Sequence, residues 1–394
     1  MMDYSIYIHI PFCQRRCNYC DFVTYAGMEQ YLPPYIDALI KEFRIVTRNA
    51  FKFPVHTIFF GGGTPSLVPV KFYDRILNAL SNYFVISNDC EISIETNPGT
   101  LSGNFLKGLK ALGFNRLSLG VQSMQPSDLQ RLERIHSVAE IYTSISAARR
   151  AGFNNINLDL MFALPWQSLA NWENTLRKAI VLQPEHFSLY SLLIEPSTKL
   201  FNWYQKGLVA LQDQDKEGAM YEFSINCLRE SGYRHYEISN WSKNNQKSDY
   251  RCQHNLQYWR YQPYLGFGAG AHGYAHKSRT ANVTGIFDYC DRITAGARHE
   301  IAFPQSPATK TLISLEISSQ MKEFMMLGLR LVDEGVSNDK FFSLFGYSLR
   351  DVFGKEISRL IKNGLVEFGG EDPSILRLTK RGVLLGNQVF MAFI

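Results

Sequence analysis

Short apolar segments alternate with helical patterns through the first half of the chain, and this alternation constrains the fold most. The apolar segments are too short for helices and cover residues 4–10, 55–60, 91–96, 116–121, 156–161 and 186–193. Amphipathic patterns predict helices near residues 31–48, 70–84, 102–112, 127–150 and 168–182. Consecutive β-then-α units favour a parallel sheet covered by helices. We therefore predict an α/β fold, a partial (β/α)6 barrel of the TIM type, because a full barrel needs eight units.

The rest of the chain departs from this alternation. Residues 212–231 predict one helix, and an irregular, aromatic-rich region follows. Near the C-terminus, helices are expected at 321–331, 338–345 and 350–362, and a hairpin at 364–379. Helices followed by a hairpin are typical of a winged-helix-like α+β module. We expect three domains: the partial barrel (1–205), its aromatic-rich extension (206–307) and the C-terminal module (308–394).

Charge and hydropathy exclude several classes of protein. The net charge is only +5, and the Lys and Arg residues do not gather in one stripe, so a nucleic-acid partner is not expected. No apolar run reaches the ~18 residues of a membrane span. We expect a cytoplasmic protein without a membrane span. In that compartment cysteines are more often metal ligands or catalytic groups than disulfides.

Three of the seven cysteines lie close together in the stretch HIPFCQRRCNYC. Cys13, Cys17 and Cys20 form a Cys-x3-Cys-x2-Cys pattern that can place three thiolates around one centre. A tetrahedral zinc ion would need a fourth ligand, for which His9 is available. An iron–sulfur cube held by three thiolates would keep one iron open for a substrate. Single cysteines elsewhere (Cys90, Cys227 and Cys290) are expected to be packing residues.

The stretch YIHIPFCQRRCNYC resembles the signature loop of the radical S-adenosylmethionine (SAM) superfamily, with the aromatic Tyr19 before the third cysteine. The resemblance implies a 4Fe–4S cluster held by Cys13, Cys17 and Cys20. It also implies that SAM chelates the fourth iron, which explains the absence of a fourth thiol. The reduced cluster of such proteins splits SAM to methionine and a 5′-deoxyadenosyl radical.

The glycine-rich stretch GGGTP follows the second apolar segment, at residues 61–65. Taken alone, it could be any tight turn or a phosphate-binding turn, although it lacks the P-loop spacing. Glycine also permits close approach of the backbone to a ligand. In radical SAM proteins the corresponding turn binds the amino group of SAM, which implies this role for Gly62, Gly63 and Thr64.

Polar residues follow several of the predicted strands. The carboxyl ends of barrel strands gather on one rim, where active sites form. In the coproporphyrinogen oxidase branch of the superfamily, residues at the matching points contact SAM. The resemblance implies SAM contacts for Tyr7, Glu95, Gln122, Arg134 and Asp159, and a backbone contact at Leu193. Arg134 could also pair with a porphyrin propionate.

Nearly the whole chain resembles the oxygen-independent coproporphyrinogen III oxidase family, through IHIPFC, FFGGGTP, ETNPG, GVQS, NLDLMFALP and EFMMLGLRL. One subgroup, the oxidases, decarboxylates two propionates of coproporphyrinogen III. The other subgroup, called HemW, is regarded as heme chaperones. Oxidases carry a further cysteine where this chain has Phe22, and a long extension where only twelve residues precede Cys13. Both differences favour HemW.

The stretch HNLQYW matches the H-N-x-x-Y-W pattern of HemW, whose histidine is associated with heme. An imidazole is a good axial ligand of heme iron, so the resemblance implies His254 as a heme ligand. The other interpretation is a histidine held by hydrogen bonds beside core aromatics. His235, His272 and His276 are further possible ligands. Cys252 does not complete a C-x-x-C-H attachment pattern.

The sequence thus predicts a heme chaperone of the HemW type that uses a 4Fe–4S cluster, SAM and heme. Its expected partners are heme or a related tetrapyrrole, a heme-acceptor protein and an electron donor. The alternative is an oxygen-independent coproporphyrinogen III oxidase, and another radical SAM reaction, on a tetrapyrrole or on nucleic acid, is a more distant one. No residue is assigned a catalytic role.

Overall fold

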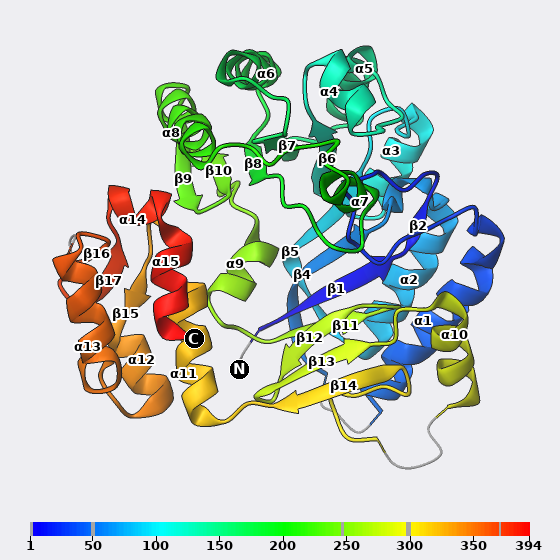
Figure 1. The fold of residues 1–394 in the computed structure, drawn as a ribbon. Coiled ribbons are helices and arrows are strands. Elements are labelled where there is room, and N and C mark those ends of the chain that lie inside the picture. Colours follow the sequence, from blue (N-terminus) through cyan, green and yellow to red (C-terminus); the bar gives the residue numbers. More distant parts are fainter. Residues whose placement is uncertain (1–2, 49–51, 246–247, 297–300, 370–371) are drawn as a thin grey trace.

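A twelve-stranded sheet organises most of the chain in the computed structural model, which describes residues 3–48, 52–245, 248–296, 301–369 and 372–394 (Figure 1). Its strand order is β14-β13-β12-β11-β1-β4-β5-β6-β7-β8-β10-β9. Six consecutive strands are parallel: β1 (Tyr4–Ile10), β4 (Pro54–Gly62), β5 (Val85–Thr96), β6 (Arg116–Gln122), β7 (Ile156–Phe162) and β8 (His186–Ser191). The α/β prediction and the six-strand partial barrel are confirmed.

Helices connect these strands on the outer side of the sheet. They are α1 (Leu32–Val46), α2 (Val70–Tyr83), α3 (Gly103–Ala111), α4 (Pro126–Arg131), α5 (Val138–Arg150) and α6 (Leu169–Val181). The apolar face of α1 is fully buried at Ile36 and Leu39, and so are Ile6 and Ile8 of β1. Burying these faces together is the main force that fixes the helices on the sheet.

The helix predicted over residues 127–150 is in fact two helices, so that prediction was wrong in one respect. The chain leaves α4 through Glu133, whose φ is +54°, and re-enters a helix at Ser137. Ser137 and Glu140 form a capping box, in which each side chain accepts a hydrogen bond from the backbone of the other residue. The capping box begins α5 and so ends the loop that carries Arg134.

The aromatic-rich region is more regular than predicted. After α7 (Lys199–Gln205) and α8 (Gln214–Glu230), two further strands extend the sheet: β10 (Asn240–Lys243) pairs antiparallel with β8, and β9 (Tyr233–Glu237) pairs antiparallel with β10. A short helix, α9 (Gln253–Trp259), precedes β11 (Tyr264–Phe267), which pairs in parallel with β1. Beyond it lie β12 (His272–Ala275), β13 (Ser278–Asn282), α10 (Ile286–Ala295) and β14 (Thr309–Ser314).

The C-terminal module contains the predicted helices and hairpin. It comprises α11 (Ile317–Gly328), β15 (Val336–Ser337), α12 (Asn338–Phe345), α13 (Leu349–Lys362), β16 (Val366–Phe368), β17 (Ile375–Leu378), α14 (Lys380–Leu384) and α15 (Gly386–Phe390). β16 and β17 pair antiparallel as predicted, whereas α11 lies several residues earlier than expected. The domain division at residues 205 and 307 stays a prediction.

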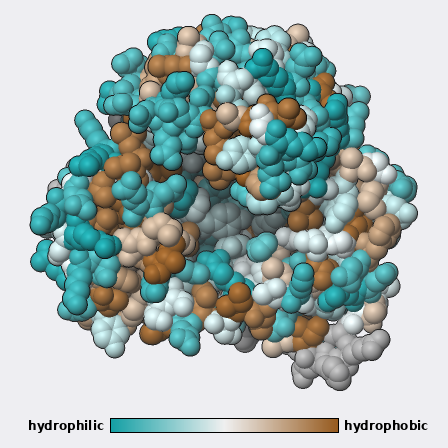
Figure 2. Space-filling model, in the orientation of Figure 1, coloured by the Kyte–Doolittle hydropathy of each residue, from teal (hydrophilic) through white to brown (hydrophobic). Residues whose placement is uncertain are grey.

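Helix α9 lies between the C-terminal module and the barrel strands (Figure 1). On the same side, the molecular surface is hollowed near its centre (Figure 2). Among the described residues, no helix is both long enough and apolar enough to cross a membrane.

Candidate functional site

A cavity of about 450 Å³ lies at the carboxyl ends of the parallel strands, and it gathers most of the predicted site residues. These are Cys13, Cys17, Tyr19, Cys20, Gly62, Gly63, Thr64, Glu95, Gln122, Arg134 and Asp159. They come from six separate parts of the sequence, which meet because parallel strands end on one rim of a barrel. The cavity is large enough for a small-molecule cofactor.

The three cysteines lie on a loop that the fold holds at both ends. Strand β2 (Phe12–Cys13) pairs in parallel with β3 (Tyr25–Ala26), which closes the loop between them. Cys13 is buried, Cys17 and Cys20 are half-buried, and all three are free thiols. Burial raises the pKa of Cys13 to about 11 and also raises the pKa of Cys20.

The chemistry of these donors fits an iron–sulfur cluster. Thiolates are the usual ligands of such clusters, and hydrogen bonds to their sulfur atoms tune the potential. Thr64 Oγ1 donates to Cys13 Sγ at 3.5 Å, and Arg134 Nη1 donates to Cys17 Sγ at 3.6 Å. Within the part of the chain that the structure describes, no three His, Cys, Asp or Glu side chains are gathered as they would be around a single metal ion.

His9, the possible fourth ligand of a zinc site, is engaged elsewhere. Its Nε2 donates to the carbonyl oxygen of Val23 at 2.8 Å, so Nδ1 accepts from the Tyr7 hydroxyl at 2.9 Å. The ring also fills the space beside Gly62, where a Cβ would lie 2.4 Å from His9 Cε1. His9 therefore supports the cysteine loop and the glycine turn.

The turn of GGGTP is bound directly to the segment that carries Cys13. The amide of Gly63 donates to Ile10 O, and the amide of Thr64 donates to Phe12 O, both at 2.8 Å. The φ of Gly62 is +113°, a conformation that favours glycine. The turn and the cysteine loop are thus one rigid unit at the edge of the cavity.

Two half-buried carboxyl groups lie beside this unit. Glu95 Oε2 accepts from the Gly62 amide at 2.9 Å, and desolvation raises the pKa of Glu95 to about 7. Asp159 accepts from Ser118 Oγ at 2.9 Å and from Asn157 Nδ2 at 2.8 Å, and desolvation raises its pKa as well. Carboxyl groups at a cavity wall can bind the ammonium or hydroxyl groups of a ligand.

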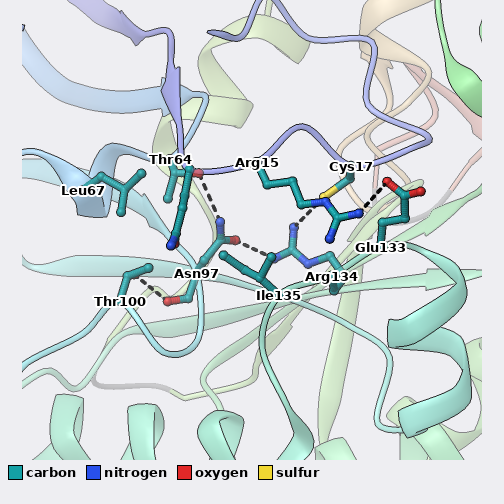
Figure 3. A pocket seen from close by; sticks show the side chains of 10 residues that line it. Arg15, Cys17, Thr64, Leu67, Asn97, Thr100, Glu133, Arg134 and Ile135 are labelled. Carbon is teal, nitrogen blue, oxygen red and sulfur yellow. Dashed lines mark hydrogen bonds and ion pairs between the residues drawn. The ribbon is translucent and has the colours of Figure 1, made fainter. Parts of the chain in front are cut away.

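Arg134 is fixed by several hydrogen bonds (Figure 3). Its Nη2 donates to Gly120 O at 2.8 Å and to Asn97 Oδ1 at 2.5 Å, while Nη1 reaches Cys17. Asn97 lines the same cavity and was not among the predicted residues. Its place in ETNPG, directly after a strand, does not by itself mark a site residue, because asparagine is common in turns. Met161 and Tyr190 also line the cavity and were not predicted either.

Three predicted residues are not part of the cavity wall. Tyr7 is half-buried in the sheet beside His9, and desolvation raises its pKa well above the usual value. The side chain of Leu193 is 69% exposed and lies beyond the end of β8. His254 lies on α9, fully buried.

Both ring nitrogens of His254 have hydrogen-bond partners. Nδ1 lies 2.7 Å from Thr57 Oγ1, and Nε2 lies 2.7 Å from the Tyr258 hydroxyl. The ring stacks on Phe59 with centroids 5.1 Å apart, and burial lowers its pKa to about 3. The imidazole is therefore neutral at physiological pH, as an iron ligand must be, but its Nε2 would have to release Tyr258 first.

The other candidate histidines differ in their surroundings. His235 stacks on Trp241 with centroids 4.2 Å apart, and its Nε2 lies 3.2 Å from Ile238 O. His272 and His276 are exposed. Neither of these two lines the cavity around the cysteines.

Comparisons with known proteins agree with this geometry. The profile of the Radical SAM superfamily matches residues 7–179, and that of the HemN C-terminal domain matches residues 318–385. The chain is 39% identical to the heme chaperone HemW of Bacillus subtilis, over 99% of each chain. It is 34% identical to the heme chaperone HemW of Escherichia coli, over 99% of this chain and 98% of the relative.

A solved structure shares the fold. It is that of coproporphyrinogen III oxidase (HemN) from Escherichia coli, described as a radical SAM enzyme. The TM-score is 0.83 at 23% identity, over 100% of this chain and 90% of that one.

Proposed function

The chain belongs to the HemW family of heme chaperones within the radical SAM superfamily, and from this we propose that it carries heme to an acceptor protein. Radical SAM proteins use a 4Fe–4S cluster and SAM. The observation that carries the proposal at the level of residues is that one cavity is lined by the three cysteines, the glycine turn and the carboxyl groups of Glu95 and Asp159.

Cys13, Cys17 and Cys20 would hold the cluster. Gly62, Gly63 and Thr64 would bind the amino group of SAM. The rest of SAM would be bound by Glu95, Gln122 and Asp159 of the strands and by Arg134 of the loop between α4 and α5, with Tyr7, Tyr19 and Leu193 as further contacts. When bound and reduced, the cluster supplies an electron to SAM. The protein orients SAM and keeps water away from it.

His254 would be the heme ligand, because it stands in the HNLQYW stretch and is held neutral. Tyr258 and Trp259 of the same helix line a neighbouring cavity of about 230 Å³ together with Tyr261, Tyr264 and Tyr274. Such aromatic walls suit the edge of a flat macrocycle. Binding there would require Tyr258 to release His254 Nε2.

The oxidase alternative is less well supported. The similarity to the solved oxidase shows the fold alone, whereas the curated HemW relatives are 34–39% identical over almost their full length. In addition, Phe22 takes the place of the further cysteine and is 68% exposed on the wall of the cavity.

The remaining parts of the proposal concern partners and location. Transfer of heme needs an acceptor, and reduction of the cluster needs an electron donor. We propose that both are proteins. All seven cysteines are free thiols, which agrees with a cytoplasmic location.

Anaerobic turnover tests the proposed function. The reconstituted protein is supplied with SAM, a reductant and coproporphyrinogen III, and the products are separated by chromatography with 5′-deoxyadenosine as the internal control. We expect SAM cleavage without decarboxylation, together with heme binding that is weakened in His254→Ala. Multiple turnovers to protoporphyrinogen IX would instead establish the oxidase activity.

A further inference from the structure

A chain of hydrogen bonds joins two of the three cysteines through Asn97, and Figure 3 shows its part from Thr64 to Cys17. Asn97 Oδ1 accepts from Arg134 Nη2 at 2.5 Å, and Arg134 Nη1 in turn donates to Cys17 Sγ at 3.6 Å. On its other side, Asn97 Nδ2 donates to Thr64 Oγ1 at 3.2 Å, and Thr64 Oγ1 donates to Cys13 Sγ at 3.5 Å. The side-chain amide of Asn97 is thus connected to two sulfur atoms: through Thr64 to Cys13 Sγ, and through Arg134 to Cys17 Sγ.

The direction of each hydrogen bond follows from the chemistry of the amide. Only the NH2 group of an asparagine can donate, so Thr64 Oγ1 must accept from Asn97. The one proton of the Thr64 hydroxyl is then left for Cys13 Sγ. A guanidinium has donors alone, so the amide oxygen of Asn97, together with Gly120 O, holds Arg134 in the orientation that reaches Cys17. Asn97 therefore aims both donors at sulfur.

We propose that Asn97 is a positioning residue that raises the reduction potential of the iron–sulfur cluster by directing hydrogen bonds of Thr64 and Arg134 to the sulfur atoms of Cys13 and Cys17. The inference rests on the proposed binding of the cluster by these cysteines. Hydrogen bonds to cluster sulfurs stabilise the additional negative charge of the reduced state and so raise its potential.

A merely structural role of the Asn97 side chain fits the geometry less well. The backbone of Asn97 is held by its own hydrogen bonds: its amide donates to Ser66 Oγ at 3.3 Å, and its carbonyl accepts from the amide of Thr100 at 3.2 Å and from Thr100 Oγ1 at 2.7 Å. The loop therefore keeps these anchors when the side chain is changed.

The test is a redox titration of the reconstituted cluster without SAM, followed by electron paramagnetic resonance. In Asn97→Ala, Arg134 Nη2 keeps Gly120 O but loses the shorter of its two hydrogen bonds, so the guanidinium is less firmly oriented toward Cys17 and we expect a more negative potential. The expected size is at least a tenfold change in the one-electron equilibrium constant, which corresponds to 59 mV. In Asn97→Asp, the carboxylate accepts the Thr64 proton, so the potential should fall further.

Asn115→Ala is the matched control. Its side chain bonds to strand β5, at Ile92 N and Cys90 O, and in the described part of the chain it bonds to no atom of the cysteine loop. We expect its potential to equal that of the wild type. Thr64→Val removes the hydrogen bond to Cys13 directly and should lower the potential without any change at Asn97.

The outcomes separate the inference from the proposed function. Potentials of both Asn97 variants equal to that of Asn115→Ala, with a full cluster present, would overturn the role of Asn97 alone. A wild-type protein that assembles no 4Fe–4S cluster would overturn both. If Asn97→Ala does not fold, Asn97→Asp and Thr64→Val decide the question.

Discussion

At the scale of single residues, Glu95 shows how burial prepares the site for a ligand. Its side chain is half-buried, and among the described residues only the Gly62 amide donates to its carboxyl group. A pKa of about 7 instead of 4.5 means that the folded protein holds a proton on Glu95 that the unfolded chain releases. The stability connected with this proton is present below about pH 4.5 and is lost as the pH rises through 7.

Glu95→Gln should therefore stabilise the cluster-free protein at high pH. Because glutamine needs no proton, the variant should exceed the wild type by ~3 kcal/mol at pH 8 and by much less at pH 5. Denaturant unfolding at both pH values measures the difference. A difference that does not change between pH 5 and pH 8 would contradict the raised pKa.

The hydrogen bonds of His254 lead to a prediction for heme binding. Thr57 Oγ1 donates to Ser5 Oγ at 2.6 Å, so it accepts from His254 Nδ1, and the lone pair of Nε2 accepts from Tyr258. Iron would need that lone pair. Removing a competing hydrogen bond that contributes about 1 kcal/mol would raise the affinity for heme about fivefold.

Tyr258→Phe should accordingly tighten heme binding about fivefold, as measured by absorbance titration. Tyr264→Phe is the control, since its ring packs on Tyr258 but its hydroxyl does not reach His254. If Tyr258→Phe weakened heme binding as much as His254→Ala does, the tyrosine itself would be the group that heme requires.

At the scale of elements, the break between α4 and α5 positions Arg134. Ser137 caps α5, and Ser168 caps α6 in the same way, by accepting from the amide three residues later. Each Ser→Ala change should cost about 1 kcal/mol of unfolding free energy. Only Ser137→Ala should also weaken SAM binding several-fold, because only that cap anchors the loop of Arg134. Equal SAM affinities in calorimetry would contradict this role of the cap.

The elements of the site differed in how well the sequence predicted them. The cysteine loop and the GGGTP turn could be identified because the spacing of their residues is itself the chemical signal. Asn97 could not, since an asparagine after a strand is common in turns. What distinguishes Asn97 is its contact with Arg134, which lies 37 residues away in the sequence. Contacts of that kind depend on the folded barrel.

At the scale of the whole molecule, the partial barrel was predictable and its extension was not. Periodicity revealed six parallel strands, but GFGAGAHGY reads as a loop because glycine is rare in strands. In the structure these glycines permit close strand pairing: a Cβ on Gly266 of β11 would lie 1.9 Å from His272 O of β12. The sheet therefore continues through a segment whose composition predicts a loop.

The C-terminal module is connected to the heme-binding helix proposed above by ion pairs. Glu334 accepts from Arg251 Nη1 at 2.9 Å and from Arg260 Nε and Nη2 at 2.9 and 2.6 Å, and these two arginines flank α9. Arg330 extends the contact, since its guanidinium lies 4.5 Å from the ring centroid of Trp259 and 5.2 Å from that of Phe390. The position of α9 thus depends on a distant part of the sequence.

Glu334→Gln should loosen this connection. Glu334 is about one-third exposed, so we expect a loss of only about 1 kcal/mol in unfolding free energy. Burial opposes ionisation of Glu334, but the arginines outweigh it and lower its pKa, so the loss should appear above about pH 4.5 and vanish in acid.

Heme affinity should fall in parallel, because α9 carries His254. Glu367→Gln is the control, since its carboxylate pairs with Arg377 inside the module. If both variants bound heme equally well, the module would stabilise the fold without any influence on α9.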